Sequence, residues 1–323
     1  MIKRYAVTIA VVALGCSMAC NAQQNYPVRP VRLLVNVQPG GAADYIARVM
    51  GQRLGDVLGQ VFVVDNRTGG SGMAAAVFVA KAASDGYTLM LASVGTHGIR
   101  PSMYKKLPFE PVKDFAPIGL YGSMPLILVV NAQLPVKTVA ELIALSQLRP
   151  GGMSFASGGA GGAPHLLGEL FKMVTGANIE HIPYKGSAPA AADLAGGQVQ
   201  LAFDAVAPQL PHLKSGRTRV LAVTTPMRMA IAPDAPTMIE LGFSQINGSV
   251  WYGLTAPAGT PRAIIQRLNV ESNRLLAAQE IKDRLASVGI DAAGGTPEQF
   301  GTFIKEEIAK WGSVVKAAGI IPE

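Results

Sequence analysis

The sequence predicts an α/β protein built as two lobes with a cleft between them. Short apolar segments alternate with helical segments along the chain, a pattern typical of parallel sheets covered by helices on both faces. Three glycine-rich loops follow predicted strands, and the alternation restarts near Gly122 and returns near Trp251. We therefore expect residues 23–122 and 248–323 to form lobe 1 and residues 123–247 to form lobe 2. The glycine loops of both lobes should face the shared cleft.

Residues 1–22 are expected to be a signal peptide that is removed from the mature chain. Lys3 and Arg4 form its positive region, and an apolar stretch followed by small residues completes the pattern. Both cysteines, Cys16 and Cys20, lie in this segment, so cleavage after it leaves no thiol for a disulfide, a nucleophile or a metal site. The alternative is a lipoprotein signal, in which Cys16 becomes acylated and anchors the protein to a lipid surface.

Charge and length exclude some classes of protein. Two of the 28 Lys and Arg residues fall in the leader, which leaves 26 against 21 Asp and Glu in the mature chain, a net charge of +5. The basic residues are scattered without a run of like charge, which argues against a nucleic-acid partner. A mild positive excess suits an anionic ligand. About 300 mature residues fit two domains, and no later stretch is long and apolar enough to span a bilayer.

Residues 31–48 form the stretch around which the chain is organised. Residues 31–37 are apolar and β-branched and predict a buried strand, residues 38–41 form a turn with two glycines, and a helix begins at Ala42. A helix that starts directly after such a turn leaves several backbone N–H groups directed at one spot, and its dipole favours a negative group there. The spot suits a phosphate or a carboxylate, and Asp44 either caps the helix or faces the anion. The alternative is an ordinary βα loop of a parallel sheet.

The rest of the chain repeats the same two patterns. Apolar runs bounded by turn residues predict strands at residues 61–64, 87–92, 116–121, 126–130, 153–156, 180–184, 199–203, 220–224 and 251–256. Alanine-rich or amphipathic segments predict helices at residues 73–83, 139–146, 166–174, 187–195, 209–215, 261–278, 281–288 and 297–317. The last three helices are expected to pack on lobe 1.

A nucleotide cofactor is not expected. Residues 70–75 fit the G-x-G-x-x-A pattern of dinucleotide-binding loops, but residues 87–92 carry no acid at the distance where such folds hold one. An exported protein also has little access to these cofactors. The chain shows no metal-ligand spacing, so no metal is expected either.

An exported serine hydrolase is an alternative from another class. Ser93 with His97, or Ser157 with His165, would make a nucleophile–base pair if the fold brought the side chains within hydrogen-bond reach. The preferred interpretation is that each histidine orders its own loop, so no catalytic residue is assigned. Asp204 ends an apolar strand and either looks into the cleft or caps the next segment.

Several short motifs stand in a specific order along the mature chain. They are residues 39–44 (PGGAAD), 47–48, 66–67, 85–89 (DGYTL), 96–97, 157–165, 183–186 (PYKG), 194–199 (LAGGQV), 203–204 and 251–257 (WYGLTAP). Together they resemble the Bug-type extracytoplasmic solute receptors of tripartite tricarboxylate transporters, over nearly the whole mature chain. The resemblance implies a two-lobed periplasmic binding protein of the type II-like class. Such a protein closes on a small organic carboxylate and serves permease subunits in the membrane, here as an expected monomer.

The resemblance also implies which positions face the ligand, often through backbone N–H groups. In lobe 1 they are Gly40, Gly41, Ala42 and Asp44 of the first glycine loop, with Ser93, Thr96 and His97 as a second set. In lobe 2 they are Ser157, Gly158, Gly159, Gly161 and Ala163, with Asp204 behind them. A sensor that presents its ligand to a signalling partner would share this fold and is a further alternative.

The chain departs from the family pattern at three loop positions. Ala43, Gly95 and Gly162 stand where the family often has a hydroxyl side chain. Each unmade hydrogen bond in a desolvated site costs about 1–3 kcal/mol. We therefore expect citrate and malate to bind more weakly than an aromatic or longer-chain acid. The alternative is an ordinary dicarboxylate, with waters replacing the hydroxyls.

Overall fold

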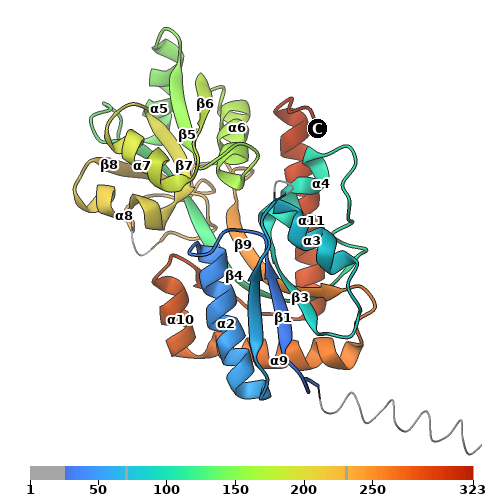
Figure 1. Cartoon of the computed structure of the whole chain (residues 1–323). Helices are drawn as coiled ribbons and strands as arrows, with labels where there is room; N and C mark the ends of the chain where they lie inside the picture. Colours follow the sequence, from blue (N-terminus) through green and yellow to red (C-terminus); the bar gives the residue numbers. More distant parts are fainter. Residues whose placement is uncertain (1–25, 70–71, 230–231, 323) are drawn as a thin grey trace, which may run out of the picture.

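The computed structural model describes residues 26–69, 72–229 and 232–322. The predicted signal peptide, with Cys16 and Cys20, lies outside the described residues. The chain forms two α/β lobes joined by long strands, which confirms the predicted fold class (Figure 1). Within the described residues, no helix is long and apolar enough to cross a bilayer.

Lobe 1 contains a mixed sheet, whereas a fully parallel one was predicted. Strand β1 (Val31–Val35) pairs in parallel with β2 (Phe62–Asn66) and with β3 (Thr88–Ser93). Strand β9 (Ser249–Pro257) lies next to β3 and is antiparallel to it. The prediction was wrong here because β9 carries the chain back from lobe 2, so it runs opposite to the strands that precede the crossing.

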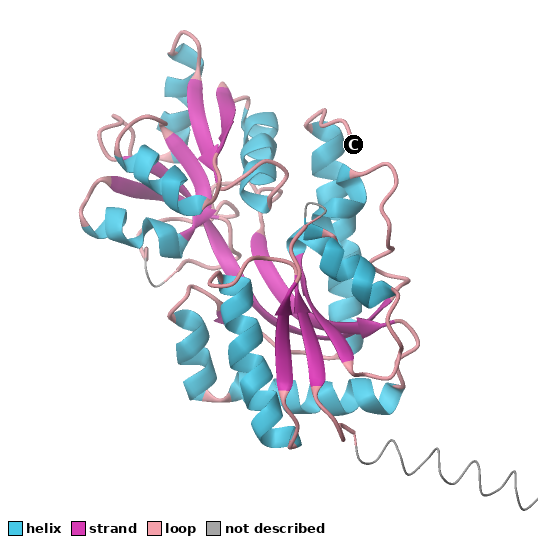
Figure 2. Ribbon diagram, in the orientation of Figure 1, coloured by secondary structure: helices cyan, strands magenta, loops and turns pink. Residues whose placement is uncertain are grey.

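One strand belongs to both lobes. Two strands were predicted at residues 116–121 and 126–130, but the structure has a single strand, β4 (Phe115–Asn131). Its first part pairs antiparallel with β9, and its last part pairs antiparallel with β7 (Leu201–Ala205) and β8 (Thr218–Val223). The short strand β10 (Asp291–Ala292) also pairs with β4 in lobe 1. Hydrogen bonding is therefore continuous through β4, and Figure 2 shows this strand running from one lobe to the other.

Gly122 explains why β4 passes so closely under β10. A Cβ atom on Gly122 would lie 2.7 Å from the backbone oxygen of Asp291 and 2.6 Å from the side chain of Ile290. Any side chain at this position would push the two strands apart. The sequence suggested a break between two strands near Gly122. In the structure Gly122 lies inside a single strand, where its missing side chain lets the backbone of β10 approach closely.

Lobe 2 keeps the predicted βα alternation. Strands β5 (Met153–Ser157), β6 (Ile179–Pro183) and β7 are parallel to one another, in the order β7-β5-β6. The helices of this lobe are α5 (Val139–Leu148), α6 (Ala163–Thr175), α7 (Ser187–Ala195) and α8 (Val206–Lys214). Helix α5 begins with a capping box, in which the Thr138 hydroxyl accepts from the Glu141 N–H and the Glu141 carboxylate accepts from the Thr138 N–H.

The remaining helices cover lobe 1 and reach toward lobe 2. They are α2 (Ala42–Leu58), α3 (Ala74–Ala80), the π-helix η2 (Val94–Ile99), α4 (Arg100–Met103), α9 (Arg262–Ala277), α10 (Gln279–Ala286) and α11 (Pro297–Ala317). Helix α11 packs on β4 and η2 in lobe 1 and also contacts α6 of lobe 2. The largest core cluster accordingly includes residues of both lobes, such as Leu33, Phe155 and Trp311.

Candidate functional site

The first glycine loop ends in a helix start that no side chain caps. Gly41 is the N-cap of α2 and its oxygen accepts the first intrahelical bond, from the Tyr45 N–H at 2.9 Å. Gly40 adopts a left-handed φ of +97° with open space around its Cα. Gly40 and Gly41 are exposed and Ala42 is half-buried. The free N–H groups of the first turn and the helix dipole therefore present a positive spot to solvent.

Asp44 is held inside this loop by the protein itself. Its Oδ2 accepts hydrogen bonds from the Gly40 N–H (3.0 Å) and from Arg48 Nε (2.9 Å), and its Oδ1 accepts one from Asn66 Nδ2 (3.0 Å). The hydrogen bond from Arg48 is the main cause that lowers the pKa of Asp44 to about 2. Asn66 also donates to the Val37 oxygen, at 3.0 Å. The buried Asp44 carboxylate therefore shapes the loop from within, and its predicted position facing the ligand stays a prediction.

The second set of predicted residues is mostly buried in lobe 1. Thr96 and His97 have no exposed surface, and Ser93 is 7% exposed. The Thr96 hydroxyl accepts a hydrogen bond from the Ser93 N–H (3.2 Å) and lies 2.9 Å from His97 Nδ1. The His97 ring packs edge-on against Phe115, at 4.6 Å between ring centroids.

These contacts correct two expectations about His97. Burial lowers its pKa to about 3, so the ring is neutral. Its Nε2 atom has no hydrogen-bond partner among the described residues, and it does not reach the surface. The ring therefore neither faces a ligand nor contacts Ser93, because Thr96 lies between them. The contacts of His97 are with its own loop and with Phe115.

The third glycine loop is fixed by a histidine that the sequence analysis did not assign. Ser157 Oγ lies 2.7 Å from His181 Nε2 and 3.0 Å from the Gly159 oxygen, which it can reach as a donor. His165 instead accepts a hydrogen bond from the Gly161 N–H through Nδ1, at 3.1 Å. The predicted pair Ser157–His165 is therefore wrong, and the pair is Ser157–His181.

The two histidines behind this loop stack on each other. The His165 and His181 rings lie 3.9 Å apart between centroids, with an angle of 27° between their planes. Burial lowers the pKa of His165. Burial and then the charge of His165 lower the pKa of His181 to about 4. Both rings are thus neutral near pH 7 and serve as hydrogen-bonding and packing groups beneath the loop.

The third loop also ends in an uncapped helix start. Gly162 is the N-cap of α6 and has no side chain to cap it, and its oxygen accepts from the Leu166 N–H at 3.0 Å. Pro164 carries no N–H, so Ala163 and His165 supply the free donors of this first turn. Each lobe therefore offers one long helix whose N-terminus follows a glycine loop at the carboxyl end of a parallel strand. Figure 1 shows both helix starts near the boundary between the lobes.

Asp204 is a buried carboxylate behind the third loop. Its Oδ1 accepts from the Ala205 N–H (2.9 Å) and its Oδ2 accepts from Gln209 Nε2 (2.9 Å), so both carboxylate oxygens are bonded within the protein next to the start of α8. Burial raises its pKa, against the opposing effect of hydrogen bonds from Gln209, Ser187 and Ala205. Ser187, which hydrogen-bonds to Asp204, lies against the third loop, because its Oγ would be 2.9 Å from a Cβ atom on Gly158. Asp204 is therefore separated from the loop by the Ser187 side chain. These contacts give Asp204 a structural role, and its predicted place behind the ligand stays a prediction.

The lobes touch at the third loop. The Met103 methyl group of α4 would lie 3.3 Å from a Cβ atom on Gly161. Helix α4 of lobe 1 thus approaches the third glycine loop of lobe 2 at this point. Within the described residues, no cluster of three or more His, Cys, Asp or Glu side chains could hold a metal ion.

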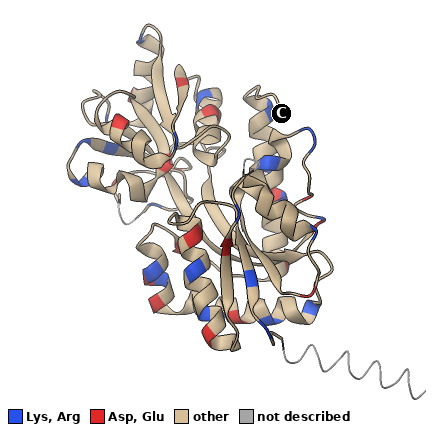
Figure 3. Ribbon diagram, in the orientation of Figure 1, with Lys and Arg blue, Asp and Glu red and all other residues tan. Residues whose placement is uncertain are grey.

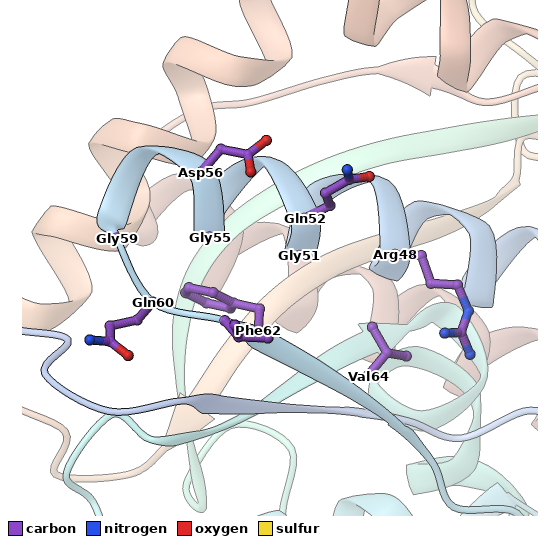
Figure 4. A pocket seen from close by; sticks show the side chains of 10 residues that line it. Arg48, Gly51, Gln52, Gly55, Asp56, Gly59, Gln60, Phe62 and Val64 are labelled. Atoms are coloured by element: carbon purple, nitrogen blue, oxygen red, sulfur yellow. The ribbon is translucent and has the colours of Figure 1, made fainter.

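A separate groove of about 480 Å³ runs along the side of α2, beside β2 (Figure 4). Arg48 lines one end of it, and Gln52, Asp56 and Phe62 line the middle. The groove lies along the helix body, whereas the free N–H groups lie at the helix start. Charged residues of both signs are interspersed over the face of the molecule in Figure 3.

Comparisons with known proteins agree with this geometry. The model of the family described as "Tripartite tricarboxylate transporter family receptor" matches residues 46–320. Protein BugT of Bordetella pertussis is 38% identical over 314 residues, covering 97% of this chain and 96% of BugT. The structure of Rpa4515 from R. palustris with adipate has a TM-score of 0.80 and 38% identity, covering 92% of this chain and 100% of that chain.

A second solved structure shows the same fold with another ligand. MatC from Rhodopseudomonas palustris with bound malate has a TM-score of 0.76 and 31% identity, covering 90% of this chain and 100% of that chain. The family match extends over most of the sequence, and BugT is similar over nearly its full length. The chain belongs to the tripartite tricarboxylate transporter receptor family.

Proposed function

We propose that this protein is a periplasmic receptor that captures a small organic carboxylate between its lobes and delivers it to the membrane permease of a tripartite transporter. The observation that carries the proposal is the pair of uncapped helix starts, α2 in lobe 1 and α6 in lobe 2, each following a glycine loop. Backbone N–H groups at a helix start bind a carboxylate without a cationic side chain. The relatives solved with adipate and with malate support the ligand class.

The predicted site residues divide into two roles in this proposal. The ligand contacts backbone N–H groups at Gly41, Ala42 and Gly158 and the backbone surfaces of Gly40, Gly159 and Gly161, whose own N–H groups already donate within the protein. Ala163 and Ser93 lie at the edge of this set. The buried residues Asp44, Thr96, His97, Ser157 and Asp204 keep these loops in shape from behind. Exposure supports most of this division, because the glycines and Ala42 are exposed or half-buried whereas the five residues behind them are buried. Ala163 and Ser93 are buried as well, and they are kept as ligand positions for their place in the first turn of α6 and at the end of β3.

Binding is proposed to close the lobes around the crossing strands. We place lobe 1 at residues 23–122 and 248–323 and lobe 2 at residues 123–247. Both crossings between the lobes then lie close to the point where β4 changes its partner. Up to Pro125, β4 pairs with β9, and from Leu126 it pairs with β7. A carboxylate that accepts hydrogen bonds from α2 and α6 at once would favour the closed arrangement.

Capture rather than turnover is the proposed activity. Ser157, which has a histidine partner, is 1% exposed, and its hydroxyl is already engaged by Gly159 and His181. A nucleophile must reach the substrate carbon, which this position does not allow. Export by the predicted signal peptide, with or without a lipid on Cys16, and a monomeric state complete the proposal.

The test is the identity of the ligand and its effect on shape. Mass spectrometry of the small molecule released from natively purified protein should give an organic acid. Titration calorimetry with that acid should show binding, and small-angle scattering should show a smaller radius of gyration at saturation. Hydrolysis of generic esters that is lost in Ser157→Ala, or scattering that does not change on binding, would contradict the proposal.

A further inference from the structure

Arg100 lies where several loops of lobe 1 come together. It is the first residue of α4 and follows directly on η2, the helix that begins after Ser93. A Cβ atom on Gly72 would lie 3.8 Å from Arg100 Nη2 and 3.3 Å from Asn36 Nδ2. Asn36 follows the end of β1 and precedes the first glycine loop. The guanidinium therefore sits at the carboxyl ends of the parallel strands, beside the loop that precedes α2.

Three other arginines of lobe 1 have carboxylate partners. Arg48 pairs with Asp44 at 2.9 Å, and Asp65 pairs with both Arg67 (3.1 Å) and Arg32 (3.3 Å). Arg67 also packs over the Phe78 ring. Each of these cations has a carboxylate partner in lobe 1, although Arg32 and Arg67 share the single charge of Asp65.

Arg100 differs from them in its partners. Its Nη1 donates to the Tyr104 hydroxyl at 3.0 Å, and its guanidinium lies 5.5 Å from the centroid of the Tyr104 ring. Within the described part of the chain, no carboxylate lies within ion-pair distance of it. The side chain is partly buried, so a surface of Arg100 is open to a bound molecule. Arg100 is thus an uncompensated cation with donors still free.

The opposite lobe faces the same helix. Met103, one turn after Arg100 on α4, contacts the third glycine loop at Gly161. A ligand held between α2 and α6 would therefore lie next to α4. Its second polar group, if it has one at a suitable distance, would meet the guanidinium.

We propose that Arg100 selects dicarboxylates by binding the second carboxylate of a ligand whose first carboxylate meets the helix starts. This inference rests on the proposed function and names its ligand class. A guanidinium presents parallel N–H donors that match the two oxygens of a carboxylate, whereas an ammonium acts as a point charge. It also favours a diacid over the monocarboxylate or aromatic acid that the missing hydroxyls of Ala43, Gly95 and Gly162 suggested.

The experiment compares linear diacids with monoacids of equal chain length, from four to eight carbons, by titration calorimetry. The wild type should bind its best diacid about 10–100-fold more tightly than the matched monoacid, as one charge-assisted contact allows. Arg100→Gln should remove most of this preference while leaving the monoacid affinity unchanged. Arg100→Lys should keep part of it. Lys105→Gln, which removes an exposed cation five residues along the chain, should keep all of it.

Two controls keep the outcomes distinct. Tyr104→Phe, which removes the hydroxyl bound to Arg100, should retain the diacid preference if the free donors carry it. Melting curves should show that each variant is folded. Equal binding of diacids and monoacids by the wild type, or an undiminished preference in Arg100→Gln, would overturn the role of Arg100 and leave the proposed function standing. Failure of the wild type to bind any carboxylate in the panel or from native purification would overturn both.

Discussion

Ser157 and His181 share a hydrogen bond of 2.7 Å, between Oγ at the end of β5 and Nε2 on β6. The bond joins the two strands that carry the third glycine loop. It also places the His181 ring on His165, whose Nδ1 holds the Gly161 N–H. The shape of the loop therefore depends on two rings that are neutral near pH 7, and this dependence gives the first prediction.

Protonation of His181 should destabilise the protein as the pH falls. Its pKa is lowered to about 4 in the folded state from an ordinary value near 6.5, so the unfolded chain takes up the proton first. The contribution is fully present above about pH 6.5 and is lost as the pH falls toward 4. His181→Gln, which stays neutral, should show a flatter dependence of melting temperature on pH in this window.

The control for this prediction is His212 on α8, whose Nδ1 lies 3.1 Å from Arg217 Nη2, a partner outside the third loop. His212→Gln should keep the pH dependence of the wild type. Buried His97, whose pKa is lowered to about 3, also makes stability fall at low pH. Because it is present in both variants, its effect on the melting temperature does not alter the comparison. An identical pH profile in His181→Gln and the wild type would contradict the prediction.

Replacement of Asp204 should affect stability more than ligand affinity. In Asp204→Ala the Ala205 N–H and Gln209 Nε2 lose their acceptor, and a buried donor left unpaired costs about 1–3 kcal/mol. Urea unfolding should show a loss of this size, while calorimetry on folded protein should give a dissociation constant close to that of the wild type. Unchanged stability with a large loss of affinity would return Asp204 to the ligand site.

Glu307 should be a sensitive point of the interface between β9 and α11. Its Oε2 accepts hydrogen bonds from the indole N–H groups of Trp251 (2.8 Å) and Trp311 (2.9 Å), and Lys310 pairs with its other oxygen. Glu307→Ala would leave two buried indole donors without a partner, which should lower the free energy of unfolding by about 2–5 kcal/mol. Glu307→Gln keeps one acceptor and should cost less.

Fluorescence can follow this change directly, because the chain has only two tryptophans and both bond to Glu307. The emission of Glu307→Ala should shift to the red if solvent reaches the freed indoles. An unchanged spectrum together with unchanged stability would show that the shared carboxylate is dispensable.

A hydroxyl restored at the third loop should favour oxygen-rich ligands. Gly162 has φ −86° and only ordinary contacts at 3.7 Å around its Cβ position, so it accepts a side chain without strain. Gly162→Ser adds a hydroxyl at the start of α6, and Gly162→Ala adds the carbon alone as the matched control. We expect malate to bind about tenfold more tightly to the serine variant than to the alanine variant.

The hydroxyl added in Gly162→Ser can bond either to the ligand or to the start of α6, and the same experiment distinguishes the two. As an N-cap it can bond to a free N–H of α6, which would stabilise the helix by about 1 kcal/mol and occupy a donor that the ligand needs. A higher melting temperature with weaker binding of every acid would show that capping wins and would refute the prediction about ligand choice.

Local chemistry was enough to predict the elements that depend on neighbours in the chain. The turn at Gly40 and Gly41, the start of α2 at Ala42 and the helix at residues 187–195 appear where propensity and glycine placement put them. The two-lobe class was also predictable, because the βα alternation restarts after the first crossing, although the largest core cluster includes residues of both lobes. Element boundaries elsewhere differ by a few residues, since helix and strand ends depend on tertiary contacts.

Only the tertiary structure decided which side chains meet. His181 lies opposite Phe155 in the parallel register of β5 and β6, which brings its ring to the face on which Ser157 lies two residues further on. Register depends on the packing of whole strands, so the sequence could not choose His181 over the nearer His165. Burial is decided in the same way, because the π-helix after Ser93 turns His97 against Phe115 in the core and leaves Arg100, at the start of α4, only partly buried.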